Sequence, residues 1–381
     1  MGDSTSDIIS NLPPDVLEKI LMCLTIQDAA MTSVLSRKWR YIWTTLPHLV
    51  FRGKSFRGSM LRAKPDKLMI TIYKVLLFHH GPILKFVLSS MKLTSCPEID
   101  QFLYFVSSNG IRELTLHIHK GEPYKLPSTL FSCLQLEHLS LRSCVLKPPP
   151  AFKGFTKLLS LELYEVFIAG DVLSCLASSC LLLERLTVHS STTYDHLEIV
   201  APNLKCLRFK GLFRSICIRM PSVAEVAIIL RRSRKQLGFN EGEISNSIMF
   251  LGSLTLVEVL VLDYPYVKCM AASGLRERLP TTLNNLKDLR LHDICFGEPD
   301  EVSGTKVEME FIKLLLAKSP MLRTMDIKLK SKEVAEELRI LKELIRFRRA
   351  SADALQSFYK YDNHMTFTIM YTNLKDANEV G

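Results

Sequence analysis

The sequence predicts an α/β fold in which a small helical unit is followed by a solenoid of short repeats. Apolar residues recur with helical spacing over the first forty positions. A short apolar pattern then recurs ten times between residues 83 and 327, and helix-like segments such as 172–176 and 311–316 lie between its copies. We expect a curved parallel sheet with helices on its outer side.

The first forty residues predict three short helices. Pro13 and Pro14 suit the first turn of a helix, where the missing N–H of proline has no partner to lose. Further short helices are predicted over 27–33 and 36–43. Apolar residues with helical spacing form one face of the first helix: Val16, Leu17, Ile20, Leu21 and Leu24. A core this small predicts a unit that gains stability from a partner or a following domain.

The rest of the chain carries the leucine-rich repeat template. Its clearest copy is Leu136-x-x-Leu139-x-Leu141-x-x-Cys144-x-Leu146. The first residue of the central pair falls, in ten successive copies, at positions 86, 114, 139, 161, 186, 207, 226, 260, 289 and 325. Most intervals suit a repeat of about 20–29 residues, and longer insertions are predicted over 231–253 and 297–310.

Residues beside the central pairs predict a binding face. In a strand the paired apolar side chains point into the core, and the period of two sends their neighbours to the opposite face. Stacked strands present these neighbours as one surface, which is the usual binding face of a solenoid. We expect target contacts from Arg142, Glu162, Tyr164, Arg185, His189, Arg208, Lys210, Arg290 and His292. Asp263, Asp288 and Asp326 are predicted to point outward with them.

The N-terminal helices resemble an F-box. The resemblance covers residues 8–50 and is carried by 12–21, 28–30 and 33–40. It implies docking on a Skp-family adaptor, which links the protein to a cullin and so to ubiquitin transfer. Transferred by position, the docking surface is Leu12, Pro13, Ile20, Leu24, Val34, Ser36 and Trp39. The alternative is an internal core, which suits Val16, Leu17 and Leu21 better than it suits Pro13 and Trp39.

The whole arrangement resembles the plant-type F-box proteins with leucine-rich repeats and a C-terminal FBD region. Residues 81–88 are similar to the phrase that opens the repeats of that family, and residues 311–322, 341–344 and 347–351 are similar to its FBD tail. The predicted division is 8–50 for the F-box, 51–82 for a basic linker and helical connection, 83–310 for the repeats, and 311–381 for the FBD-like region and tail.

The net charge of +10 is concentrated in two patches. Residues 37–67 and 201–235 each contain nine basic residues and one acid. Such patches indicate specific surfaces rather than a uniform polyanion-binding coat. Binding of nucleic acid or of another anionic surface is therefore one alternative function, although no recognised nucleic-acid module is present. We favour an acidic protein surface as the partner of the second patch.

No apolar run reaches the length of about 20 residues that a membrane helix needs, so we expect no membrane partner.

The residues carry no recognisable catalytic or cofactor motif. The ten cysteines include no Cys-x-x-Cys pair, and we expect reduced thiols in an intracellular protein of the nucleus, the cytoplasm or both. His117 and His119 share a strand face but lack further metal ligands in the sequence. No phosphate-binding loop or nucleophile elbow appears. We therefore expect no cofactor, no metal and no enzymatic activity of the chain itself.

The sequence favours a substrate-recognition adaptor of an SCF-type ubiquitin ligase. In this interpretation the F-box binds the Skp-family adaptor, and the repeat face binds a protein target for ubiquitination. The alternative is a leucine-rich-repeat scaffold that binds proteins outside any ligase, for which the N-terminal helices would be dispensable.

Overall fold

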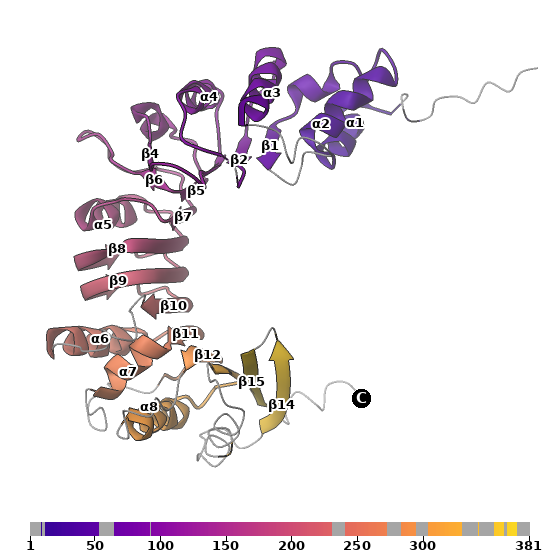
Figure 1. Ribbon diagram of the computed structural model, residues 1–381. Coiled ribbons are helices and arrows are strands. Elements are labelled where there is room, and N and C mark those ends of the chain that lie inside the picture. The colour runs from indigo at the N-terminus through magenta and orange to yellow at the C-terminus, as the bar shows by residue number, and fades with distance from the viewer. Residues whose placement is uncertain are drawn as a thin grey trace, which may run out of the picture. The chain divides into compact units, whose positions relative to one another are not determined.

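The computed structural model describes residues 9, 12–52, 65–91, 93–230, 241–272, 283–294, 304–329, 342, 354–361 and 364–371 of the 381-residue chain. The chain divides into two compact units, Met1–Ile168 and Ala169–Gly381, which we call unit 1 and unit 2. Figure 1 labels their helices and strands. Each unit is described by itself.

Unit 1 begins with a small helical unit. Helix α1 (Pro14–Met22) has proline at its start as predicted, and α2 (Ile26–Met31) begins at Thr25, whose side-chain oxygen accepts the N–H of Asp28. A 3-10 helix, η2 (Thr32–Val34), follows. The predicted third helix over 36–43 is wrong, because turns lead there into the 3-10 helix η3 (Ile42–Thr45). In that segment N–H groups bond three residues back, as from Thr44 to the Tyr41 carbonyl at 3.1 Å.

The core of the helical unit includes Leu17, Leu21, Ala29 and Trp39, all buried. Val16, which we expected to point inward, is exposed. The reason is the helical period: Leu17 and Leu21 lie four residues apart on the buried side of α1. Val16 and Ile20 form the adjacent stripe, which the unit leaves at its surface.

The helical unit continues without a break into a parallel sheet. Strand β1 (His48–Arg52) pairs in parallel with β2 (Lys85–Ser89), and the sheet of unit 1 runs in the order β1-β2-β3-β5-β7. Strand β1 was not predicted, and the predicted boundary at residue 50 falls inside it. The remaining strands are β3 (Glu113–His117), β5 (His138–Arg142), β7 (Ser160–Tyr164) and the short pair β4 (Tyr124–Lys125) and β6 (Cys144–Val145). Helices α3 (Pro65–Phe78), α4 (Glu98–Ser107) and η6 (Ser128–Ser132) connect them.

The segment that follows α3 packs closely against the helical unit. The His80 N–H donates to the Thr44 carbonyl at 2.9 Å. A Cβ atom at position 81 would lie 2.8 Å from the Thr45 carbonyl oxygen, so only glycine fits this approach.

Unit 2 continues the repeats and ends in a hairpin. Its strand order is β8-β9-β10-β11-β12-β13-β15-β14. The parallel strands are β8 (Arg185–Val200), β9 (Cys206–Arg219), β10 (Glu225–Leu230), β11 (Val259–Asp263), β12 (Asp288–Ile294) and β13 (Thr324–Leu329). Strands β14 (Ala354–Tyr361) and β15 (His364–Tyr371) are antiparallel, and β15 pairs with β13. The helices are α5 (Gly170–Ser179), α6 (Glu241–Ser253), α7 (Tyr264–Ala272) and α8 (Gly304–Lys318); α5 packs on β8 and α6 on β9.

The register of the strands confirms the repeat pattern. In unit 1 the predicted central residues stand opposite one another, with Phe86 beside Leu114, then Leu139 and Leu161. In unit 2 the same holds for Leu186, Leu207, Val226, Leu260, Leu289 and Met325. All ten side chains are buried, and in each unit they form a column that runs from strand to strand. We call these residues the column residues. Leu49 of β1 is a further column residue of unit 1.

A backbone ladder supports each column. The carbonyl two residues before a column residue accepts two N–H groups from the start of the next strand. The N–H groups of Glu137 and His138 both donate to the Arg112 carbonyl, at 2.8 and 2.9 Å. In unit 2 those of Lys205 and Cys206 donate to the Glu184 carbonyl, at 2.8 and 3.0 Å. The turns into the strands are therefore held by main-chain atoms.

Several predicted segments are only partly described. The insertion predicted over 231–253 contains α6 from Glu241, and that over 297–310 contains the start of α8 at Gly304. Residues 231–240, 295–303 and most of those that carry the FBD resemblance after position 329 lie outside the described part. Within the described residues, no helix is long and apolar enough to span a membrane.

Candidate functional site: the strand face and the helical unit

The strand register places the outward residues of unit 1 in rows. We call the row at the last position of each strand the carboxyl-end row: Arg52, Ser89, His117, Arg142 and Tyr164. Two positions earlier lies the middle row of Val50, Val87, Thr115, Ser140 and Glu162. Three of the predicted target contacts, Arg142, Glu162 and Tyr164, therefore lie together on β5 and β7.

These three residues form a polar cluster with His117 and Ser140. The His117 Nε2 atom lies 2.9 Å from the Ser140 hydroxyl, which donates to Glu162 at 3.0 Å. The Tyr164 hydroxyl donates to the same carboxylate at 3.3 Å. Because the single proton of Ser140 goes to Glu162, the His117 Nε2–H must be the donor to Ser140. The histidine therefore does not act as a base toward Ser140, as a serine nucleophile would require.

Arg142 is the cation of this cluster. Its guanidinium carbon lies 4.9 Å from the centre of the Tyr164 ring, within the range of a cation–π contact. Its buried Nε atom has no hydrogen-bond partner among the described residues. Arg142 thus presents a partly buried positive charge whose hydrogen-bonding capacity is not fully used within the described chain.

Burial keeps His117 neutral. Desolvation, followed by the positive charges of Arg142 and His119, lowers the pKa of His117 to about 4, and Arg52 contributes in the same direction. Burial also lowers the pKa of His119. The two imidazole rings lie 6.4 Å apart, but the described residues contain no group of three or more His, Cys, Asp or Glu side chains that could hold a metal ion.

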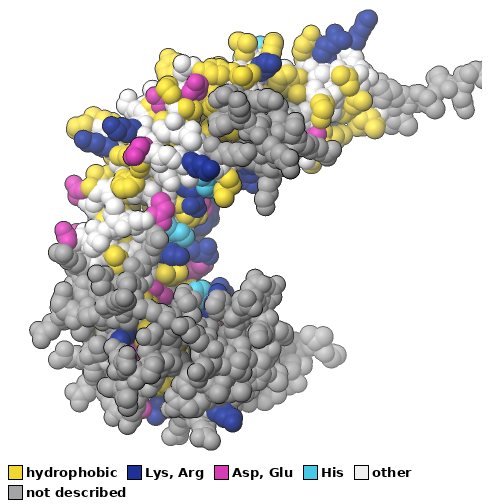
Figure 2. All heavy atoms as spheres, in the orientation of Figure 1, with side chains coloured by type: hydrophobic (Ala, Val, Ile, Leu, Met, Phe, Trp, Pro, Cys, Tyr) yellow, Lys and Arg dark blue, Asp and Glu magenta, His cyan; other side chains and the backbone are white. Residues whose placement is uncertain are grey.

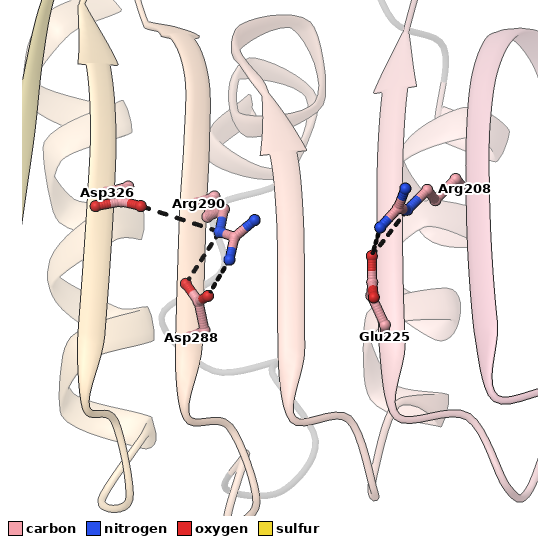
Figure 3. Close-up of polar contacts among 5 residues, drawn as sticks. All are labelled: Arg208, Glu225, Asp288, Arg290 and Asp326. Carbon is pink, nitrogen blue, oxygen red and sulfur yellow. Dashed lines mark hydrogen bonds and ion pairs between the residues drawn. The ribbon is translucent and has the colours of Figure 1, made fainter. Parts of the chain in front are cut away.

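In unit 2, two of the three predicted arginines, Arg208 and Arg290, are paired with carboxylates (Figure 3). The Arg208 Nε and Nη2 atoms donate to Glu225 at 2.8 and 2.6 Å. Arg290 donates to Asp288 and lies 3.9 Å from Asp326. Hydrogen bonding to these acids raises the pKa of both arginines. The basic patch over 201–235 is partly neutralised in this way, because its Lys205 also pairs with Glu184 at 2.6 Å.

The other predicted contacts of unit 2 are distributed along the strands. Arg185 is exposed at the start of β8, and His189 and Lys210 are register partners on β8 and β9. His292 stands opposite Asp263. The prediction that Asp263 presents its carboxylate outward is wrong: the residue is 3% exposed, and its Oδ1 atom accepts the N–H of Tyr266 at 3.2 Å. Asp263 therefore caps the N-terminus of α7.

The helical unit leaves several predicted docking residues at its surface. Val34 is 87% exposed, Leu24 42% and Ile20 37%, and Pro13 is exposed beside the partly buried Leu12. Ser36 is partly buried. Figure 2 shows apolar side chains gathered over α1 and α2. Contiguous apolar patches on the surface of a soluble protein are typical of interaction sites.

Trp39 requires a correction. We expected it at the docking surface, yet it is 4% exposed and belongs to the core of the helical unit. The turns over 37–41 bring the indole inward, where its large apolar area stabilises a unit with few other core residues.

The predicted target contacts did not include Ser140, His117 or Arg52, although His117 was placed on a strand face as half of a possible metal pair. The signal was present in the repeat alignment, since His117 and Ser140 follow Leu114 and Leu139 by three residues and one residue respectively. Arg52 could be found only by recognising Leu49 and Phe51 as the alternating pair of an additional strand.

Comparison with known families agrees with this organisation. The F-box domain matches residues 9–51, and the family described as "At1g61320/AtMIF1, LRR domain" matches residues 76–359. The α/β fold with an N-terminal F-box and leucine-rich repeats is therefore confirmed. The FBD region is supported by the names of relatives alone.

Curated relatives from Arabidopsis thaliana share these parts. The chain is 34% identical over 414 aligned residues to F-box/FBD/LRR-repeat protein At1g13570, covering 93% of this chain and 98% of the relative. It is 29% identical to putative F-box/LRR-repeat protein At4g15060, covering 86% of this chain and 81% of that protein. FBD-associated F-box protein At5g56370 is 34% identical over 47% of this chain and 42% of its own length. The chain belongs to the F-box/FBD/LRR-repeat protein family.

Proposed function

We propose that the protein is a substrate-recognition adaptor of an SCF-type ubiquitin ligase. The F-box docks on a Skp-family adaptor and through it on a cullin, and the strand face of the repeats binds the protein target. The F-box and repeat relatives support an adaptor of this general kind. The chain contributes no covalent chemistry, because it accelerates ubiquitin transfer by holding a target lysine near the ubiquitin-loaded enzyme.

The observation that carries the proposal is the apolar surface of the helical unit. Ile20, Leu24 and Val34 remain exposed although Leu17 and Leu21 of the same segment are buried. Covering such side chains with a partner gains roughly 25 cal/mol for each Å² of apolar area removed from water. A carboxylate introduced among them would have to be desolvated in the complex and should abolish it.

Pull-down of a purified Skp-family adaptor tests this assignment. We expect Ile20→Asp and Val34→Asp, as well as Leu12→Asp with Pro13→Asp, to abolish adaptor binding while the thermal unfolding of the chain is retained. Met91→Asp is the matched control, since Met91 is also an exposed apolar residue but lies outside the helical unit. Adaptor binding that survives all three changes in the helical unit would exclude this docking surface.

A further inference from the structure

The carboxyl-end row of unit 1 contains two cations and no acid. Its members are Arg52, Ser89, His117, Arg142 and Tyr164. The histidine does not add a charge, because burial and the nearby arginines hold its pKa at about 4. Arg52 is exposed and Arg142 is partly buried, so the two guanidinium groups supply the positive charge of the row.

The two arginines of the row differ from the cations at the opposite, amino-terminal ends of β2 and β3, which are neutralised by ion pairs. Lys85 pairs with Glu113 at 2.5 Å, and Arg112 pairs with Glu137 at 3.7 Å. Among the described residues, neither Arg52 nor Arg142 forms an ion pair, and the buried Nε of Arg142 has no hydrogen-bond partner. A partly desolvated guanidinium without an acid is the arrangement that a carboxylate from a partner would complete, by charge-assisted hydrogen bonds.

The distance between the two arginines determines how far apart two carboxylates of the partner must be to reach both. Arg52 on β1 and Arg142 on β5 are separated by three strand-to-strand steps. At about 4.8 Å a step this is roughly 14 Å. An extended peptide advances about 3.4 Å a residue, so two of its residues that lie four apart span the same distance.

We propose that the carboxyl-end row of unit 1 binds an extended acidic segment of the ubiquitination target, with two carboxylates four residues apart on Arg52 and Arg142. This inference rests on the proposed function, for which it specifies the chemistry of the target. The segment crosses the strands, with the ring of Tyr164 and the neutral imidazole of His117 beside it.

A protein segment suits this face better than nucleic acid. The Glu162 carboxylate lies in the adjacent middle row, where it accepts hydrogen bonds from Ser140 and Tyr164. A continuous phosphate backbone would be repelled by this charge. A peptide can place an uncharged residue or an N–H donor near Glu162 while its acidic side chains reach the two arginines.

Fluorescence anisotropy with defined peptides tests the proposal. The probes are fluorescein-labelled twelve-residue Gly/Ser peptides with two aspartates separated by zero to six intervening residues. The protein is the full chain bound to its Skp-family adaptor, at physiological salt. We expect the peptide with three intervening residues to bind most tightly. Arg142→Gln and Arg52→Gln should each weaken that binding about fivefold or more, because each removes one charge pair. Lys153→Gln, which removes an exposed positive charge outside the row, should leave it unchanged.

Charge reversal provides a second and stricter readout. A chain with Arg52→Glu and Arg142→Glu should lose the aspartate peptide and gain the equivalent lysine peptide. Arg52 is exposed, so Arg52→Gln remains informative even if an Arg142 variant unfolds. Equal binding of all spacings, absence of binding to every aspartate peptide, or tighter arginine-dependent binding of inorganic phosphate or of an oligo-dT strand would overturn the inference. Adaptor pull-down of the same variants separates these results from failure of the F-box assignment, since the arginine changes should leave it intact.

Discussion

Trp39 stabilises the helical unit from within. Its indole is buried beside a core that includes Leu17, Leu21 and Ala29. We expect Trp39→Ala to lower the free energy of unfolding by about 3–5 kcal/mol, because it leaves a large cavity in a small core. Denaturant unfolding would measure the loss, with Trp39→Phe as the milder control. If the Trp39→Ala chain is folded and equally stable but fails to bind the Skp-family adaptor, Trp39 belongs to the docking surface and not to the core.

His117 makes the stability of unit 1 sensitive to acid. Its folded-state pKa of about 4 lies below the ordinary value of 6.5, so the unfolded chain takes up a proton first as the pH falls. The contribution of His117 to stability is complete above pH 6.5 and is lost between 6.5 and 4. Since one pKa unit corresponds to about 1.4 kcal/mol, the shift sets a ceiling of about 3.5 kcal/mol on the loss, and solvent screening of the partly exposed ring makes the actual loss smaller.

Comparison with a His117→Gln variant isolates this effect. His79 also has a pKa lowered by burial, so the wild-type chain contains more than one acid-sensitive group. We expect thermal unfolding of His117→Gln to depend less steeply on pH than that of the wild type over the same window. Equal slopes for the two proteins would show that His117 is not desolvated in the folded chain.

At the scale of single elements, Asp263 shows that a residue at the end of a strand can cap the following helix instead of contributing its side chain to the strand face. The alternation of β11 predicts an outward carboxylate, but α7 follows directly and its Tyr266 N–H requires an acceptor. Asp263→Ala should lower the free energy of unfolding by about 1 kcal/mol, and Asp263→Asn should retain most of the cap. Chemical denaturation of the two variants would show the difference, and an equal loss for both would contradict a capping role.

The elements that the sequence predicted well are those that repeat. Ten strands follow from ten copies of one apolar pattern, because each column residue must be buried against its neighbours in the stack. Strand β1 was not predicted because it lies within the F-box resemblance and contains only one alternating pair of apolar residues, Leu49 and Phe51. The segment over 36–43 was assigned to a helix from its composition, although its hydrogen bonds close three-residue turns. Local pattern thus defines repeated elements better than isolated ones.

For the whole molecule, β1 determines where the chain can be divided. It belongs both to the segment that matches the F-box and to the sheet, and Leu49 and Phe51 are fully buried. Deleting residues 1–50 would cut this strand and leave the edge of β2 unpaired. We expect that truncation to lower the melting temperature and promote aggregation, whereas deletion of residues 1–46 should be milder because β1 is kept. Light scattering during thermal melting would measure both, and identical behaviour would argue against a structural role for β1.

The candidate site could be predicted only in part for a physical reason. The sequence identifies which residues point outward, and Arg142, Glu162 and Tyr164 indeed lie together. It does not state which charges are already paired. Arg208 and Arg290 look equivalent to Arg142 in sequence, yet their neighbours on the sheet are Glu225, Asp288 and Asp326. Asp288 lies two residues from Arg290 on the same strand, but Glu225 and Asp326 come from neighbouring strands, and those contacts become visible only when the strand register is known.

The backbone ladder at the start of the strands separates support from recognition. Because main-chain carbonyls hold these turns, exposed side chains on the outward rows, such as Arg52, can be exchanged with little effect on folding. Substitutions at such exposed positions usually change stability by less than about 0.5 kcal/mol. A duplicated gene of this type could therefore acquire a new partner through a few substitutions on the outward face while its fold is unchanged. Binding specificity in such proteins can diverge faster than the fold.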